Sequence, residues 1–492
     1  MFCGLVSYSS EKPVFFEAPL GGKSQKMPIQ SAKTEFHPST QDSFIRSFYD
    51  KNIEEEPIIQ KRYAMPIKHV TLEDCIAIAM EKNFKMKIFN AKESQWRWAF
   101  RNQTAQFAPS IFYGYDISNL NGAFLAGGVI PTRVNETPIE SNFYLRFPLF
   151  DGGYRIFKRK SVKNQYDASK KDVGYTREQV LRDVSVSYYR LLAYKLGVRV
   201  LLRNYEEIQA QVMIAKKNGS EFDILRSEAF LSAASQLLSK KYAEYRTEQS
   251  AFANLLGVDV LDLVLPSEEV ITQKTLVDKK LDIESIYQVA YQSRPDLDSM
   301  RLKIKSLENE KKTLYAGFAP HLDGYGSMGN VGTHRLGMIP SREIGVLFTM
   351  PFGRNMGAYE YTECNRYDSL IDEAKYNLQN HSRNIEQDII TAYYAINNSS
   401  QRSFDAEEQV VTSDKSLLMA FERLEKGGLY VDVWQTQLSK TDAKLNLINA
   451  IADYNVAQVN QLFNMGAISV YNLTENIAPN PVKEEMDIRL EK

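Results

Sequence analysis

The residue types that most often carry chemistry are present in this chain, but they form no reactive pattern. The five histidines fall in no metal-ligand spacing, and the sequence contains no P-loop, no GxSxG and no HExxH motif. The three cysteines, Cys3, Cys75 and Cys364, include no CxxC pair, so they predict neither a disulfide framework nor a zinc site. We therefore predict no catalytic residue, no cofactor and no metal, and hence no enzyme.

One string, GYGSMG at residues 324–329, fits the GxGxxG pattern of dinucleotide-binding sites. Such a site needs a preceding strand and a helix that opens after the motif. Here a helix ended by Pro320 precedes the string, and a loop containing glycine and asparagine follows it. We predict instead a strand whose alternate glycines allow close packing or a bend.

Two aspartates are the remaining candidates, because each follows a glycine by four residues just after a long apolar repeat. Asp223 has Arg226 three residues later, which favours plain capping of a helix N-terminus. Asp432 has Gln435 at that position, and this spacing fits a capping box with Asp432 as the N-cap residue. Capping is therefore the first interpretation of both aspartates.

Long helices must position these aspartates. The apolar repeats before them keep an unbroken 4-3 heptad spacing, which indicates side-by-side helices with left-handed supercoiling. A helix from about Tyr154 to Lys216 would be ~95 Å long. The first repeat consists of Val180, Val184, Ser187, Leu191, Tyr194, Val198, Leu201, Tyr205, Ile208 and Val212. The second consists of Ile385, Ile389, Ala392, Ile396, Ser399, Ser403, Ala406, Val410, Ser413, Leu417, Ala420 and Leu424.

A shorter helix and two strands are predicted before each long helix. The first helix runs from Leu72 to about Phe107, with Thr71 as its N-cap. Alternating apolar residues then predict strands, separated in the first half by a loop from Asn119 to Pro138. The strand candidates are 110–118 and 139–148 in the first half, and 321–329 and 343–351 in the second half.

Every strand candidate touches a proline at the end nearest the helices. Proline lacks a backbone donor and fixes φ, so it interrupts a helix or ladder and indicates an abrupt change of direction. Gly152 and Gly153 loosen the corner after the second strand. The four junction prolines are Pro109, Pro148, Pro320 and Pro351.

The two halves are copies of each other. Residues 72–109 can be laid over 283–320 without a gap, at a constant offset of 211 (283 minus 72). Two copies of about 200 residues indicate a tandem duplication rather than a short-period solenoid. We predict an extended or disordered lead (1–68), a first repeat (69–265), a linker (266–280), a second repeat (281–467) and a C-terminal tail (468–492).

Composition narrows the choice of partners. The 60 basic and 61 acidic residues balance, so no electrostatic footprint for nucleic acid is present. No stretch reaches the ~18 apolar residues of a membrane-spanning helix, although alternating barrel strands of about 10 residues leave only a faint hydropathy signal.

Cys75 lies among apolar residues at helical spacing and is predicted to be a core residue. The sequence alone does not decide between a cytosolic chain and one with an export signal upstream of its first residue. In the second case Cys3 could be the lipid-carrying cysteine of a lipoprotein.

Over residues 70–467 the chain resembles the TolC family of bacterial outer-membrane efflux proteins. No single motif decides this, but the order and the duplication of several motifs do. The residues that carry the resemblance are Leu72-Glu73-Asp74 and Ile283-Glu284-Ser285, Phe107-Ala108-Pro109 and Phe318-Ala319-Pro320, FPLFDGG at 147–153, Tyr188-Tyr189, Asp223-Ile224-Leu225, and Leu255-Leu256-Gly257.

The resemblance implies a mixed α and β membrane protein that forms a homotrimer in the cell outer membrane. Each protomer would give four strands to a shared transmembrane β-barrel, and its long helices would form a coiled-coil α-barrel in the periplasm. The implied function is the passive exit duct of a tripartite efflux or type I secretion system, with a periplasmic adaptor protein, an inner-membrane transporter and outer-membrane lipid as partners. A structural or adhesive coiled-coil surface protein is the alternative, which would explain the heptads but not the alternating strands.

The resemblance also assigns roles to the two helix turns, 217–220 and 427–430. They would form the periplasmic entrance and contact the adaptor. Asp432 matches the position at which some family members constrict the entrance with an aspartate ring, whose clustered carboxylates would favour cations. Gln435 stands where a second acid can occur, and Asp223 is the first-half counterpart. The predicted adaptor contacts are Gly219, Ser220, Gly428, Leu429 and Tyr430.

Overall fold

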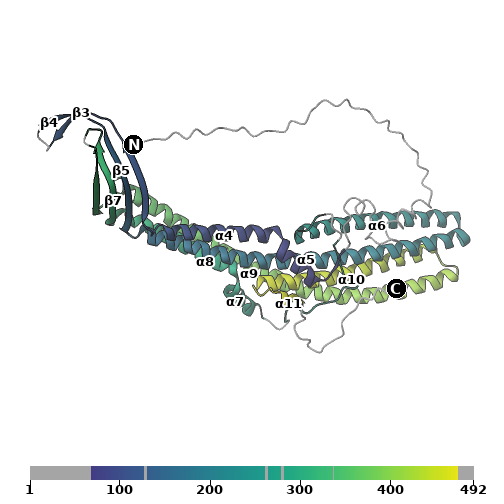
Figure 1. The fold of residues 1–492 in the computed structure, drawn as a ribbon. Coiled ribbons are helices and arrows are strands. Elements are labelled where there is room, and N and C mark those ends of the chain that lie inside the picture. The colour runs from purple at the N-terminus through teal and green to yellow at the C-terminus, as the bar shows by residue number, and fades with distance from the viewer. Residues whose placement is uncertain (1–67, 127–129, 261–263, 279–281, 336, 475–492) are drawn as a thin grey trace, which may run out of the picture. The chain divides into compact units, whose positions relative to one another are not determined.

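The computed structural model describes residues 68–126, 130–260, 264–278, 282–335 and 337–474 (Figure 1). The predicted lead before Lys68, including Cys3, and the predicted tail beyond Thr474 lie outside the described residues. Each half of the described chain contains a broken helix, antiparallel strands, a very long helix and a returning helix.

The first predicted helix is in fact two helices, α3 (Leu72–Lys82) and α4 (Phe84–Ala105). Thr71 caps α3 as predicted, and Cys75 is fully buried as predicted. The break is at Asn83, whose side-chain oxygen accepts hydrogen bonds from the first turn of α4. Its amide group donates to the Leu255 carbonyl at 2.6 Å. The prediction of one helix was wrong because this distant contact holds Asn83 outside the helical conformation.

The second half has the same break at the equivalent position. There α7 (Ile283–Ser293) is followed by α8 (Pro295–Thr313) and by the short 3-10 helix η1 (Leu314–Phe318). Arg294 separates α7 from α8 and lies 211 positions after Asn83, which is the offset of the duplication. Here a proline at the first helical position begins the new helix, in place of an asparagine cap.

Four strands form one antiparallel sheet in the order β2-β5-β7-β8. They are β2 (Ser110–Ile117), β5 (Pro138–Asp151), β7 (His321–Thr333) and β8 (Gly337–Thr349). All four predicted strands are confirmed, and the string at 324–329 lies inside β7 as expected. Within the described chain, β2 and β8 are the two edges of this sheet.

Two smaller sheets were not predicted. The segment assigned to a loop contains β3 (Leu120–Ala126) paired with β4 (Ile130–Glu136), so the loop prediction from 119 to 138 was wrong. Glycine and asparagine favour loops, but backbone pairing between the two segments forms strands here. In addition, β1 (Lys68–Val70) pairs in parallel with β6 (Val264–Pro266).

Long helices make up most of the remaining chain. The first pair is α5 (Tyr154–Asn218) and α6 (Glu221–Leu256), and the second is α9 (Ala358–Glu425) and α10 (Tyr430–Asn464). A 3-10 turn, η2 (Arg354–Gly357), precedes α9, and α11 (Val470–Thr474) ends the described chain. No described helix is both long and apolar enough to cross a membrane.

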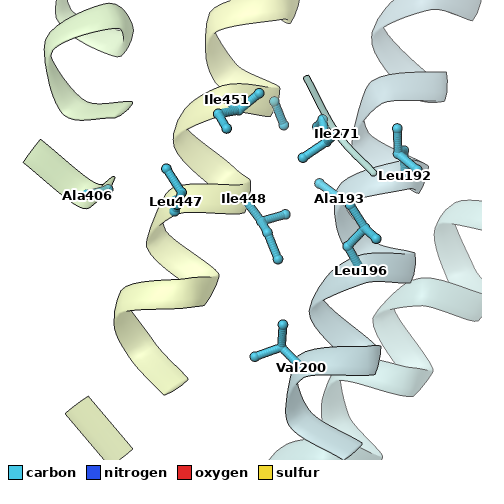
Figure 2. Packing of buried hydrophobic residues seen from close by; sticks show 10 residues of the cluster. Leu192, Ala193, Leu196, Val200, Ile271, Ala406, Leu447, Ile448 and Ile451 are labelled. Atoms are coloured by element: carbon cyan, nitrogen blue, oxygen red, sulfur yellow. The ribbon is translucent and has the colours of Figure 1, made fainter. Parts of the chain in front are cut away.

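Burial of one heptad stripe on each long helix is confirmed. Most of the predicted positions on α5, from Val180 to Val212, are buried, and so are most of those on α9, from Ile385 to Ala420. Figure 2 shows one buried cluster, in which Ile448 of α10 lies against Ala193 and Leu196 of α5. Ile271 from the segment between the repeats closes the same cluster. The helices of the two repeats therefore share one core.

A buried ion cluster joins α8 to its neighbours. The Arg294 guanidinium donates to both oxygens of Asp296, at 3.1 and 2.7 Å, and to the Asn464 carbonyl. His381 of α9 lies 2.7 Å from the same carboxylate. Burial alone raises the pKa of Asp296, but hydrogen bonds from His381 and Arg294 outweigh it and lower this pKa to about 2. The carboxylate is therefore a fixed charge that ties three helices together.

The junction prolines mark the ends of strands with one exception. Pro109 precedes β2, Pro320 precedes β7 and Pro351 follows β8, as predicted. Pro148 instead lies inside β5, which continues to Asp151 through a register shift between Pro148 and Phe150. A bulge accommodates the missing proline donor without ending the strand.

The glycine corner after β5 is tightly packed. Gly152 and Gly153 have left-handed φ values of 66° and 88°. A Cβ atom at Gly152 would lie 2.7 Å from the Cβ atom of Ala319 and 3.0 Å from the backbone of Ala316. The two repeats thus approach each other through a position that only glycine fits.

We expect Gly152→Ala to lower the free energy of unfolding by roughly 2–4 kcal/mol, because left-handed strain and steric overlap add together. Gly427→Ala is the matched control, since φ is 91° at Gly427 and no atom lies within 4 Å of its added Cβ. It should cost only about 1 kcal/mol. Urea unfolding followed by circular dichroism compares the two, and equal losses would contradict the packing argument.

Candidate channel surfaces

The four-stranded sheet has one face that is almost entirely apolar. Ile111 of β2 opposes Leu145 of β5, and Phe143 opposes Met328 of β7, so their side chains project from the same face. These large side chains are exposed in the single chain, and Ile344 on β8 is 92% exposed. The large apolar members are Ile111, Tyr113, Tyr115, Ile117, Ile139, Phe143, Leu145, Phe147, Leu322, Met328, Met338, Ile344, Val346 and Phe348. Ser141, Asn330 and Arg342 are its polar members.

The opposite face of the sheet carries most of its polar groups, and several of these bind one another, although Phe112, Ile339 and Leu347 also project from it. Arg146 donates to Asp323 on the neighbouring strand at 3.2 Å. Glu140 accepts hydrogen bonds from Asn142 and from the Tyr144 hydroxyl, both at 2.5 Å. A sheet with one apolar face and one more polar face suits a boundary between lipid and water.

The structure reveals two charged junction residues that sequence reasoning missed. Arg155, at the start of α5, donates to Asp151 at 2.7 Å and to the Pro148 carbonyl at 2.7 Å, and its guanidinium lies over the Phe107 ring. A cation in the first turn of a helix interacts unfavourably with the helix dipole. The position of Arg155 in the sequence could therefore have indicated that this residue has a specific partner. It joins the end of β5 to the chain that leaves α4.

The corner of the second repeat uses a carboxylate instead. Glu360 is 5% exposed, and both of its oxygens accept the Arg354 backbone N–H at 3.0 Å. It also lies directly against Gly317 and Gly353, where a Cβ atom would meet its side chain at 2.9 Å. The two corners are therefore closed by side chains of opposite charge.

The first helix turn is a capped hairpin. Gly219 ends α5, and Ser220 is the N-cap of α6. Asp223 is the N3 residue of a capping box, and its carboxylate accepts from the Ser220 backbone N–H at 3.2 Å and from the Ser220 hydroxyl at 2.6 Å. Asp223 therefore does take part in capping α6, as predicted. The predicted position was wrong, because Ser220 is the N-cap residue and Asp223 is the N3 residue.

The second helix turn is not capped in the predicted way. α10 begins at Tyr430 with Leu429 as N-cap, and Asp432 lies in the first turn, so the capping box of Asp432 with Gln435 was wrong. Gly428 closes α9 by donating to the Arg423 carbonyl at 2.9 Å, which allows the next helix to begin early. The Asp432 carboxylate makes no hydrogen bond or ion pair with any described residue, and the Gln435 side chain is exposed.

Trp434 anchors this second turn. The indole is 1% exposed, stacks on Tyr430 with ring centroids 6.0 Å apart, and contacts Phe230 of α6 at 5.4 Å. The Tyr430–Trp434 contact at i, i+4 explains why α10 starts at Tyr430. The contact with Phe230 links the second hairpin to the first. Sequence reasoning named Tyr430 but missed Trp434.

No residue cluster in the described chain suggests catalysis or metal binding. The described His, Cys, Asp and Glu side chains form no group of three that could hold a metal ion. His321 lies on the sheet, with its ring nitrogen 3.2 Å from the Ala316 carbonyl. The surfaces that distinguish this chain are therefore the two-faced sheet and the two hairpin turns.

Comparison with known proteins rests on structure alone. No protein-family model matches the sequence, and no curated protein matches it. The outer membrane channel CmeC of Campylobacter jejuni superposes with a TM-score of 0.73 at 17% identity, covering 82% of this chain and 87% of that one. The outer membrane protein VceC of Vibrio cholerae gives 0.69 at 14% identity, covering 80% and 96%. The chain has the fold of the TolC-family outer-membrane channels.

A third channel of this fold, MtrE of Neisseria gonorrhoeae, gives a TM-score of 0.65 at 14% identity and covers 80% of this chain and 88% of that one. The TolC-like fold explains how the candidate surfaces are positioned. Each of the long helices α5 and α9 begins next to the sheet and ends at a hairpin turn. The predicted resemblance in fold is thus confirmed.

We predict that Trp434→Ala frees the second hairpin, because truncating a buried indole costs roughly 3–5 kcal/mol. Trypsin should then cut after Arg423 or Lys426 at least tenfold faster than in the unaltered protein. Trp434→Phe should leave the cleavage rate close to normal, because the buried indole N–H has no hydrogen-bond partner to lose. Unchanged cleavage of Trp434→Ala would show that the anchor does not hold this turn.

Proposed function

We propose that this protein is a trimeric outer-membrane channel that acts as a passive exit duct. The observation that carries this proposal is the four-stranded sheet, which has an apolar exposed face, a more polar opposite face and two open edges. An apolar face of this size is stable against lipid, and unpaired strand edges are not tolerated there. Three copies would close the sheet by pairing β8 of one copy with β2 of the next, giving a shared barrel of twelve strands.

The long helices supply the rest of the duct. The two tandem repeats (69–265 and 281–467, joined by the linker 266–280) would each contribute one hairpin, α5–α6 and α9–α10, to a periplasmic tunnel. Exposed apolar residues on α6 and α9, such as Phe222, Leu225 and Leu418, support burial against further copies of the chain. Transport energy would come from an inner-membrane transporter, since the duct itself would only provide a path.

The hairpin turns would form the entrance to the tunnel. Gly219, Ser220, Gly428, Leu429 and Tyr430 are the proposed contacts for a periplasmic adaptor protein. Leu429 supports this assignment because an apolar side chain that is 67% exposed at a turn is suited to a protein contact.

The proposed entrance residues are Asp432, Gln435 and Asp223. Of these three, Asp432 is the best candidate for a gate. Its carboxylate is unpaired within the described chain, whereas the Asp223 carboxylate is occupied by Ser220. Three copies of Asp432 near a common axis would attract cations and repel anions. Gln435, one turn further along α10, would add a neutral polar ring.

The assembly is tested by light scattering of the detergent-extracted protein, with the detergent contribution subtracted. We expect a protein mass near three times the 56.3 kDa of one chain. Ile344→Arg should abolish membrane assembly, because a charge on the lipid face costs roughly 2–4 kcal/mol per copy. Ser341→Arg is the control on the polar face of the same strand and should still give trimers. A water-soluble monomer or dimer would refute the duct and favour a coiled-coil surface protein.

The gate is tested by conductance in planar lipid bilayers. Asp432→Asn should lower the ratio of cation to anion permeability by about twofold or more, because it removes the charge from the entrance. Asp223→Asn should leave this ratio unchanged and only weaken a helix cap, at a cost of about 1 kcal/mol. Equal permeability ratios for Asp432→Asn and the unaltered channel would rule out the Asp432 ring.

A further inference from the structure

A basic cavity lies between α5 and α10, next to the shared core. Its volume is about 280 Å³, and Val200, which closes one side of the core cluster in Figure 2, is part of its wall. The cavity is lined by Arg199, Val200, Arg203, Asn204, Glu207, Glu269, Gln437, Lys440, Thr441 and Lys444. It is outside the sheet and the hairpin turns, and the channel function does not use it.

The cavity has a small excess of positive charge. Four cations line it, two on each helix one turn apart, against two lining carboxylates. Arg199 reaches Glu269 at only 3.9 Å, Arg203 lies 3.4 Å from Glu207, and Lys440 pairs with Asp414 of α9 at 3.0 Å. Each of these three cations therefore has its own carboxylate, and Lys444 is the fourth cation that lines the cavity.

Lys444 is the cation without a partner. Its side chain is half-buried and makes no hydrogen bond or ion pair with any described residue. Burial lowers the pKa of Lys444, and the charges of Lys440 and Arg203 lower it further, while Asp414 and Glu207 act against this shift. A bound anion would give this half-buried ammonium group the ionic partner that the described chain does not provide.

Asn204 adds a second unmet donor. It is 3% exposed, and its side-chain oxygen accepts from Gln437 at 3.1 Å and from Thr441 at 2.8 Å. Its amide nitrogen is buried without a hydrogen-bond partner. A buried donor left unpaired is destabilising, and a ligand oxygen would satisfy it.

We propose that this cavity binds a small organic dicarboxylate, held by Lys444 and Asn204 on opposite helices and by the arginines of α5. Arginine binds carboxylates in a bidentate fork, and cations on two facing helices suit a ligand with two separated negative ends. Such a ligand would bridge a helix of the first repeat and a helix of the second repeat. This proposal does not depend on the channel function, so an experiment can contradict either one and leave the other standing.

Isothermal titration calorimetry of the full chain in mild detergent tests this site, with succinate as the probe at about 0.15 M ionic strength. We expect saturable binding with one site per chain. Butyrate, which has the same chain length and one charge fewer, should bind at least tenfold more weakly. The absence of saturable succinate binding, or equal binding of butyrate, would overturn the proposal.

Two variants assign the binding to the cavity. Lys444→Met should weaken succinate binding at least tenfold, while Lys171→Met, which removes an α5 cation paired with Asp298 outside the cavity, should change it less than twofold. Arg199→Met, at the more exposed rim, provides a second test if Lys444→Met does not fold. Succinate affinity unchanged by both cavity variants would overturn the site.

Discussion

The need to cover both open edges and one apolar face of a four-stranded sheet governs this structure. Backbone groups on β2 and β8 lack partners within the described chain, while side chains such as Ile344 are almost fully exposed. A sheet of this kind is unstable in water and would pair with any other edge. Lipid against the apolar face and further copies at the edges satisfy both requirements together, which is why assembly and membrane insertion belong to one proposal.

The duplication explains how one chain provides four such strands, and the structure shows how freely the copies diverged. Equivalent breaks at Asn83 and Arg294 are fixed by an asparagine cap in one repeat and by a proline in the other. The strand-to-helix corners are closed by Arg155 in the first repeat and by Glu360 in the second. The two repeats thus kept the same helix breaks and strand-to-helix corners while the residues that stabilise them changed. Different side chains can stabilise the same corner if they form hydrogen bonds there.

The hairpin turns show the same divergence in a form that matters for function. In the first turn the acid completes a capping box, so its charge serves the helix. In the second turn the Tyr430–Trp434 contact starts the helix early and leaves the Asp432 carboxylate unpaired. Sequence reasoning expected both aspartates to cap a helix, and the family resemblance gave the position of a gate to Asp432. Only the side-chain contacts separate a structural acid from a candidate gate.

The sequence by itself determined the repeats, the four main strands, the long helices and the buried heptad positions, because hydrophobic periodicity and proline are local signals. It did not determine the break at Asn83, the β3–β4 pair, the Trp434 anchor or the cavity around Lys444. Each of these depends on a contact between residues far apart in the chain, or on backbone pairing that composition does not reveal. Tertiary structure decided them, because only it brings Asn83 to Leu255, Trp434 to Phe230 and α5 to α10.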